Sequence, residues 1–279
     1  MERLQQAIEK ARAQRENSGI SKPAAAKVSA KGSRKAKADD QKGTAWKPLA
    51  PIKITRPRLQ KNRVVSVEGG PEAAPFDMLR TKVLHQAATN NWRRIAITSP
   101  DSHSGKSVTT ANLAFCLARQ PDIRTLAFDF DFRRVGLTKT LDQRPDHNMA
   151  DVLEGRVAFH DHAIRYGDRL AFGLNNGPVR HASEILQSRK TAEILDAIEE
   201  EFDPDILLFD LPPMMATDDN FGFLKYVDCA LIVAAAEKTG LDKIDVAERQ
   251  VAEITNVMGI VLNKCRYFDG AYGYEYGYY

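Results

Sequence analysis

The sequence predicts an α/β fold in which a mostly parallel β-sheet is covered by helices on both faces. Short runs that are almost entirely apolar alternate with longer stretches of helical spacing. Strands that are apolar throughout are typical of parallel sheets buried on both sides. Polar or proline-containing loops separate the runs at regular intervals, which is the pattern of repeated strand–helix units.

Six strands and four helices are expected in this fold. The strands are expected where apolar residues form a short run: RRIAITSP at 93–100, TLAFDFD at 125–131, LAFGLNN at 170–176, DILLFDLPP at 205–213, CALIVAAA at 229–236 and GIVLNK at 259–264. The helices are expected where apolar residues recur at helical spacing: 76–85, 107–119, 183–201 and 242–255. Ligands of such sheets bind beyond the carboxyl ends of the strands, where the most unusual polar residues of this sequence fall.

The chain divides into four expected parts. Residues 1–16 are strongly charged and have the pattern of a short helix, and residues 17–68 have the composition of a basic, flexible linker. Residues 69–266 carry the strand–helix units, and residues 267–279 form a tail. The arm and the tail are expected to be disordered, although 51–68 alternates apolar residues around two prolines and is expected to wrap the edge of the domain.

Charge is unevenly distributed along the chain. Between Ser21 and Arg63 there are 13 Lys or Arg residues and two Asp residues, a local charge of +11 within a net charge of +3. The rest of the chain therefore carries −8. A basic arm of this kind is either a solvated linker or a segment that contacts anionic lipid headgroups or an acidic partner. Nucleic acid is a third possibility, but it is not the expected partner.

The sequence gives no sign of a membrane span or of secretion. No run of about 18 apolar residues occurs, and the start, MERLQQAIEKARAQR, lacks the apolar core of a signal peptide. The three cysteines, Cys116, Cys229 and Cys265, are odd in number and lack the paired spacing of metal ligands. A cytoplasmic location is expected.

The first strand is followed by TSPDSHSGKSVTTANLA, which contains the end of a G-x-x-x-x-G-K-[ST] phosphate loop. Gly105 would let the backbone approach a phosphate, Lys106 would supply positive charge, and the Ser107 hydroxyl would bind Mg²⁺. Position 100 is a proline instead of the first glycine of the motif. The tripeptide alone is a weak signal, but its place between a strand and a helix favours phosphate binding over an ordinary strand–helix turn.

The second and fourth strands end in aspartates. Side chains alternate along a strand, so the Asp129 and Asp131 carboxylates are expected on the same side. They would repel each other unless a cation such as Mg²⁺ lies between them, and one carboxylate would remain free to accept a proton. The alternative is a capped strand end in which they pair with Arg133 and Arg134. Asp210 ends the fourth strand, in the position of an acid that holds a magnesium-bound water.

The chain ends in CRYFDGAYGYEYGYY, where six of its 8 tyrosines are concentrated. These are Tyr267, Tyr272, Tyr274, Tyr276, Tyr278 and Tyr279. Glycines separate them and few aliphatic residues accompany them, so the tail is not expected to bury a core. From the tail alone, two interpretations remain open: a low-complexity aromatic segment, or a set of hydroxyls presented as substrates.

Together these motifs resemble the bacterial tyrosine kinases (BY-kinases), the tyrosine autokinases of polysaccharide biosynthesis. The resemblance covers about residues 72–279 and rests on ITSPDSHSGKSVTTANLA as the Walker A region, LAFDFDFRR as the Walker A′ motif and DILLFDLPP as Walker B. MADVLEGR, LNNGPVRHASEILQS and VMGIVLNK are similar to the family's linking segments and last strand, and the tyrosine cluster is similar to its autophosphorylation site. The chain is also similar to the wider MinD/ParA-like P-loop NTPases, although Asp101 stands where these carry a signature lysine.

The resemblance implies an ATP-dependent, non-specific protein-tyrosine kinase that uses Mg²⁺ and phosphorylates its six tail tyrosines in trans, regulating exopolysaccharide or capsule synthesis and export. The residues implied as catalytic are Lys106, Asp129 and Asp131, with Asp129 preferred as proton acceptor. The residues implied to bind the nucleotide are Ser104, Gly105, Lys106, Ser107, Val108 and Asn263, the last through adenine. The residues implied to bind the metal are Ser107, Asp129 and Asp210.

The resemblance also implies partners. Without a fused membrane span, the chain is similar to family members that a separate membrane-embedded polysaccharide co-polymerase or adaptor activates, and it would be recruited to the inner face of the plasma membrane. A cognate phosphotyrosine phosphatase is implied as well. The family's E-x-x-R-x-x-R helix, which assembles a ring, is matched in residues 74–80 only by Arg80. The resemblance therefore implies a possible homo-oligomer, but it does not imply that the chain assembles into a ring.

Two other functions remain open at this point. A MinD/ParA-like ATPase switch would suit the basic arm, but not Asp101 or the tyrosine tail. A non-catalytic, nucleotide-binding scaffold of polysaccharide export would suit a phosphate loop that is poor in glycine.

Overall fold

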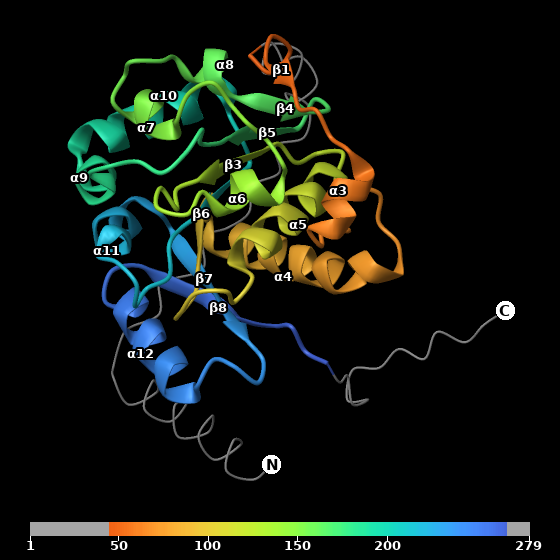
Figure 1. Cartoon of the computed structure of the whole chain (residues 1–279), viewed down its shortest axis with the longest axis vertical. Helices are drawn as coiled ribbons and strands as arrows, with labels where there is room; N and C mark the ends of the chain where they lie inside the picture. Colours follow the sequence, from red (N-terminus) through yellow and green to blue (C-terminus); the bar gives the residue numbers. More distant parts are fainter. Residues whose placement is uncertain (1–44, 267–279) are drawn as a thin grey trace, which may run out of the picture. The chain divides into compact units, whose positions relative to one another are not determined.

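An eight-stranded sheet runs through the part of the chain that the structure describes, residues 45–266 of a computed structural model (Figure 1). The strands are β1 (Ala50–Pro51), β2 (Arg94–Thr98), β3 (Thr125–Asp129), β4 (Ile164–Tyr166), β5 (Leu170–Gly173), β6 (Ile206–Asp210), β7 (Cys229–Ala235) and β8 (Asn256–Asn263). Their order across the sheet is β1-β4-β5-β3-β6-β2-β7-β8. Neighbouring strands are parallel except for β4 and β5, so the predicted mostly parallel sheet is confirmed.

Helices cover both faces of this sheet, as predicted (Figure 1). The longer elements are α3 (Arg56–Lys61), α4 (Ala74–Asn90), α5 (Lys106–Ala118), α6 (Gly136–Thr140), α7 (Met149–Leu153), α8 (Phe159–His162), α9 (Ala182–Gln187), α10 (Arg189–Phe202), α11 (Asp219–Phe223) and α12 (Leu241–Ala252). Two 3₁₀ turns, Pro71–Ala73 and Leu224–Tyr226, complete the described helical elements. Side chains from α3 to α6 contribute to one core cluster, and those from α7 to α12 contribute to the other.

Strand β3 shows why its sequence fits between two helical layers. Ala127 belongs to the core cluster that contains Phe115 of α5, whereas Phe128 belongs to the cluster that contains Phe202 of α10. Consecutive side chains of a strand point to opposite faces, so a strand covered on both sides must be apolar at every position. Phe128 also stacks on Phe209 of the neighbouring β6, with ring centroids 5.1 Å apart.

The six predicted strands are all present, but several local features differ from expectation, among them the short helices α3, α6, α7, α8 and α11, which were not predicted. Strands β1 and β4 were not predicted, because two and three residues are too few to show a period. The helix predicted over 183–201 is two helices, α9 and α10, separated at Ser188. Ser188 has extended backbone angles, and its side chain accepts a hydrogen bond from the Lys190 N–H, so it caps α10.

The part of the predicted linker that the structure describes is folded onto the domain. Trp46 and Leu49 are buried, and Trp46 Nε1 donates a 2.8 Å hydrogen bond to the Phe202 carbonyl oxygen. β1 pairs with β4, and Leu59 of α3 is buried. Residues 51–68 therefore lie against the domain, as expected, but residues 45–50, which were expected to belong to the flexible linker, are folded onto it as well. A few large apolar side chains anchor this segment, although its average composition is basic and polar.

We call residues 56–66, which comprise α3 and the chain after it, the strap. The strap lies beside α4 and α5 (Figure 1). The predictions made for residues 1–44 and for the tail, 267–279, lie outside the described residues. Within 45–266, no helix has the length and apolarity needed to cross a bilayer.

Candidate functional site

The phosphate-loop residues lie where β2 leads into α5. β2 ends at Thr98 and α5 begins at Lys106. Gly105 has φ 93°, in the left-handed region that favours glycine, and a Cβ there would collide with the Asn263 side chain. The first N–H groups of α5 have no partner within the helix and lie at its positive end. This junction therefore offers an anion the backbone donors that the sequence predicted.

Three carboxylates meet beside Lys106 at the ends of β3 and β6. Asp129 and Asp210 are register partners in these neighbouring strands, and Asp131 follows just beyond β3. Lys106 Nζ lies 2.8 Å from Asp131 Oδ2, 3.5 Å from Asp210 Oδ1 and 3.4 Å from Ser107 Oγ. Lys106 and the three aspartates are all buried. The strand-end residues singled out in the sequence therefore surround one lysine, while the individual roles assigned to them stay predictions.

No ion pair joins the β3 aspartates to the side chains of the two following arginines among residues 45–266, although the Arg134 N–H donates to Asp131 Oδ1 at 3.1 Å. Arg133 instead binds Asp219 of α11, with Nε 2.7 Å from Oδ2 and Nη2 2.9 Å from Oδ1. The Arg134 side chain borders the cavity described below. Asp219 could not be selected from the sequence, because its partner is 86 positions away.

The Asp129 carboxylate is fully buried and is contacted by α6. One carboxylate oxygen, Oδ2, accepts hydrogen bonds from the N–H (2.9 Å) and the hydroxyl (2.7 Å) of Thr138 on α6. The Asn175 side chain donates to the Asp129 backbone carbonyl at 2.6 Å. Burial, and then the nearby Asp210, raise the pKa of Asp129 to about 7. Thr138 and Asn175 support the site, and sequence analysis did not assign them to it.

Asp129→Asn is expected to flatten the dependence of stability on pH. The folded-state pKa of Asp129 is about 7, above the ordinary value of 3.8. Between these values the folded protein holds a proton that the unfolded chain has released, so the carboxyl group lowers stability progressively as pH rises. We expect the Tm of the nucleotide- and magnesium-free wild type to fall by several degrees more than that of the variant between pH 5 and pH 8.

The exposed Asp146→Asn variant is the control, and its Tm should follow the wild type at each pH. Thermal unfolding followed by circular dichroism in chelator-containing buffer makes the comparison. If Tm plotted against pH runs parallel for the wild type and Asp129→Asn, the pKa of Asp129 is not raised.

The donor set at these strand ends fits a magnesium ion. Asp129 Oδ1 and Asp210 Oδ2 are buried oxygens without a hydrogen-bond partner among the described atoms. Burial raises the pKa of Asp210, and the neighbouring Lys106 and Ser107 oppose that rise. No cluster of three or more His, Cys, Asp or Glu side chains within 45–266 forms a metal centre by itself. Mg²⁺ commonly binds one or two protein carboxylates and completes its coordination shell with waters and phosphate oxygens. The carboxylates of Asp129 and Asp210 are therefore enough protein ligands for a Mg²⁺ ion.

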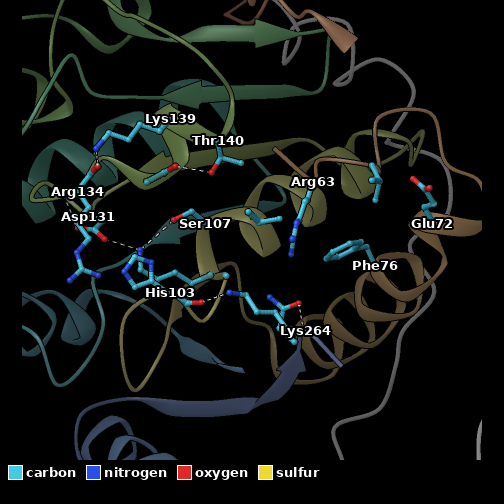
Figure 2. Close-up of a pocket in the computed structure, with 16 residues that line it drawn as sticks. Arg63, Glu72, Phe76, His103, Ser107, Asp131, Arg134, Lys139, Thr140 and Lys264 are labelled. Atoms are coloured by element: carbon cyan, nitrogen blue, oxygen red, sulfur yellow. Dashed lines mark hydrogen bonds and ion pairs between the residues drawn. The ribbon is translucent and has the colours of Figure 1, made fainter. Parts of the chain in front are cut away.

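A cavity of about 780 Å³ opens beside the phosphate loop (Figure 2). This volume is in the range of pockets that bind small molecules and cofactors. Gly105, Lys106, Ser107 and Val108 line it together with Asp131, whereas Asp129 and Asp210 do not. The basic side chains that border it are Arg63, His103, Lys106, Arg134, Lys139 and Lys264. The charge of this lining suits a polyanion such as a nucleotide phosphate chain.

Asn263 borders the cavity, and its amide joins the end of β8 to the phosphate loop. Its Nδ2 donates to the Ser104 carbonyl at 2.9 Å, and its Oδ1 accepts from the Lys264 N–H at 2.9 Å. Lys264 Nζ donates to the His103 carbonyl at 2.5 Å. The last described residues therefore leave β8 at the rim of the cavity.

Asp101, which stands in the place of a signature lysine, is paired within the chain. Its carboxylate lies 3.2 Å from Lys243 Nζ and 3.3 Å from Thr239 Oγ1. Ser104 Oγ donates to it at 3.1 Å. These contacts attach the phosphate loop to the start of α12, a link that sequence analysis missed.

Comparison with known proteins shows which family shares this fold. Residues 95–270 match the family model described as the CobQ/CobB/MinD/ParA nucleotide binding domain. The putative tyrosine-protein kinase CapB of Staphylococcus aureus is 26% identical over 72% of this chain and 89% of that protein. Tyrosine-protein kinase YwqD of Bacillus subtilis is 24% identical over 80% of this chain and 92% of that protein.

Tyrosine-protein kinase ptk of Acinetobacter johnsonii is 26% identical over 81% of this chain, but the chain spans only 31% of that longer protein. Among solved structures, the chimerical protein CapA2B2 has a TM-score of 0.66 and 23% identity, covering 78% of this chain and 93% of that one. The kinase domain of the Escherichia coli tyrosine kinase ETK has a TM-score of 0.63 and 22% identity, and the match covers 73% of this chain and 80% of that one. The structural matches show a shared fold.

Proposed function

Because this chain belongs to the CobQ/CobB/MinD/ParA nucleotide-binding family, we propose that it is an ATP-dependent protein-tyrosine kinase that phosphorylates the tyrosines at its own C-terminus. One observation carries the proposal: Lys106, Asp131 and Asp210 converge beside a cavity that Lys264, close to the last described residue, also borders. The similarity to the tyrosine kinases CapB and YwqD over most of their length supports it.

In this proposal the chain binds ATP through Lys106 and the N–H groups at the start of α5. Mg²⁺ would be held by Ser107, Asp210 and Asp129 and, when bound, would neutralise charge on the phosphate oxygens. Lys106 exchanges its contact with Asp131 for contacts with phosphate oxygens. Its positive charge is already buried among carboxylates, so little reorganisation is needed when the anion arrives.

We propose Asp131, in place of Asp129, as the proton acceptor. Asp131 borders the cavity, whereas Asp129 is fully buried and bound by Thr138. As the phenol oxygen bonds to the γ-phosphorus, the bond from that phosphorus to the bridging oxygen of ADP breaks, and the phenol proton moves to the Asp131 carboxylate. A phenol has a pKa of about 10, so the proton is transferred as the new bond forms.

The acceptor tyrosine comes from a second molecule in this proposal. Arg80, the residue that matches a ring-forming helix, is bonded within its own chain, 3.0 Å from Asp77 Oδ1 and 3.4 Å from the Cys116 carbonyl oxygen. We therefore expect transfer between molecules that meet transiently, without a stable ring.

The proposed role is the regulation of exopolysaccharide or capsule synthesis and export. A relative 29% identical over 68% of this chain is the succinoglycan biosynthesis transport protein ExoP of Rhizobium meliloti, of which the chain spans 26%. A membrane-embedded adaptor would activate the kinase and recruit it to the inner face of the plasma membrane. A cognate phosphatase would reverse the modification.

The test is mass spectrometry of the full chain after incubation with ATP and Mg²⁺. We expect phosphate on several of the six tail tyrosines, and none when all six are replaced by phenylalanine. In a mixture, wild-type protein should phosphorylate the tail of a Lys106→Met variant, which identifies transfer in trans.

Two other outcomes would replace the proposal. Release of inorganic phosphate without phosphotyrosine would favour an ATPase switch, which the family match also accommodates. ATP binding without either product would favour a nucleotide-binding scaffold.

A further inference from the structure

The strap contributes a basic side chain to the cavity, although it precedes the part of the chain that matches the family model. Arg63 follows α3 and lines the same cavity as the phosphate loop, whereas the model match begins at residue 95. Figure 2 shows the Arg63 side chain and the Phe76 ring of α4 close together, away from Asp131. The phosphate loop lies between these two ends of the cavity.

The backbone of Arg63 is held in a conformation that arginine rarely adopts. Its φ is 61°, in the left-handed region, which costs an ordinary residue about 1 kcal/mol. Asn112 of α5 fixes the backbone here: its Nδ2 donates to the Arg63 carbonyl at 2.9 Å, and its Oδ1 accepts from the N–H groups of Val65 (2.8 Å) and Ser66 (3.1 Å). Asn112 is fully buried, so the strap and α5 are joined through a dry contact.

A second set of contacts joins the strap to the other wall of the cavity. Asn62 Nδ2 donates to the carbonyl oxygens of Thr140 (3.0 Å) and Lys139 (3.3 Å) at the end of α6. Arg58 forms an ion pair with Asp142. Leu59 and Val64 are buried on either side of this region. The position of Arg63 is therefore set by contacts with both α5 and α6.

The guanidinium of Arg63 has no hydrogen-bond or ion-pair partner among residues 45–266. It faces another cation instead: desolvation, Lys238 and Arg63 lower the pKa of Lys264. Two unneutralised cations therefore approach the same space, beside the half-buried Phe76 ring. An arginine and an aromatic ring at the end of a phosphate-binding cavity form a site for a flat, electron-rich ring.

We propose that Arg63 and Phe76 bind the base of the nucleotide, so that the Arg63 end of the strap is part of the nucleotide site and docks more firmly when the site is filled. The inference rests on the proposed nucleotide-binding function and extends it by assigning the base contacts. The phosphates lie at Lys106 and the start of α5, and the base lies over Val108 toward α4. Binding of the base and docking of the strap are then coupled and strengthen each other.

Titration of the full chain with ATP and with inorganic tripolyphosphate, both in Mg²⁺, tests the assignment. Arg63→Ala is expected to raise the Kd for ATP by about 3- to 30-fold, because a cation–π contact is worth about 0.5–2 kcal/mol. Phe76→Leu, which keeps an apolar side chain but removes the ring, is expected to raise it by about 5-fold or more. Both variants should change the Kd for tripolyphosphate by less than about 2-fold, because tripolyphosphate lacks a base.

Arg56→Ala is the matched control. It removes an exposed arginine of the same strap, paired with Glu68, that does not line the cavity of the phosphate loop. Both its dissociation constants should equal those of the wild type. Hydrogen exchange gives a second measurement: ATP should slow exchange at the Val65 and Ser66 amides in the wild type and in Arg56→Ala, but not in Arg63→Ala.

Three results would overturn the inference, and they are distinguishable. If the wild type binds ATP and Arg63→Ala binds it equally well, the base assignment is wrong while the proposed function stands. If Arg63→Ala weakens ATP and tripolyphosphate equally, Arg63 is a phosphate contact. If the wild type binds tripolyphosphate but not ATP, the proposed function fails and the inference fails with it.

Discussion

Lys106→Met is expected to reduce tail phosphorylation by at least about 100-fold, the loss typical when a charge-stabilising donor is removed from an active site. Lys106 supplies the buried positive charge nearest to Asp131, Asp210 and Ser107. Without it, no buried ammonium group remains among the described residues to bind the transferred phosphoryl group. Phosphotyrosine in the tail, quantified by mass spectrometry at saturating ATP, is the measurement.

The same substitution is expected to lower stability, and this must be separated from the effect on catalysis. Removing one partner of a buried ion pair costs about 3–5 kcal/mol, because the buried carboxylates lose their counter-charge. Lys106→Arg keeps that charge in a different shape, so it should stay folded yet lose most activity. Lys82→Met, at an exposed position of α4, is the control for losing a lysine and should keep full activity. Full phosphotyrosine signal in a folded Lys106→Met protein would remove the catalytic assignment.

Asp131→Asn is expected to lower the rate of tyrosine phosphorylation by about 10²- to 10⁴-fold, the usual contribution of a positioned general base. Of the three clustered aspartates, Asp131 alone borders the cavity. ATP affinity should stay equal or increase, because one negative charge is removed beside the phosphates and Lys106 loses a competing partner. Single-turnover rates and equilibrium ATP titration separate the two effects.

Asp129→Asn is the comparison that decides between the two aspartates of β3. If Asp129 serves the metal, this variant should need more Mg²⁺ for half-maximal rate and recover most of its activity at high Mg²⁺. The exposed Asp146→Asn variant should match the wild type in every respect. Loss of the rate in Asp129→Asn at all Mg²⁺ concentrations, with Asp131→Asn within about threefold of wild type, would return the acceptor role to Asp129.

Most of the sheet was predictable because its strands are short apolar runs with sharp boundaries. TLAFDFD and DILLFDLPP could be recognised without any partner, and their paired carboxyl ends followed from the rule that parallel strands end at the same edge. The folding of residues 45–68 was harder to predict, for the opposite reason. Trp46, Leu49 and Leu59 are isolated among polar residues, and only their burial against distant elements shows that this segment is folded.

The assignment of roles to the aspartates was less predictable than their position. Alternation along a strand predicted that the Asp129 and Asp131 side chains lie on the same side, but it could not show which of them borders the cavity. Thr138, which encloses Asp129, lies on a five-residue helix that has no clear period in the sequence. The ion-pair partner of Arg133 was also not predictable, because Asp219 comes from another strand–helix unit.

The sequence by itself determined the α/β fold, the phosphate loop, the order of the acidic strand ends and the presence of a tyrosine-rich end, because each depends on residues adjacent in the chain. The tertiary structure decided that Asp131 and not Asp129 faces the cavity, and that Arg63 reaches it from outside the region matched by the family model. Such facts depend on contacts between residues far apart in sequence, which are formed only when the sheet brings its strand ends together.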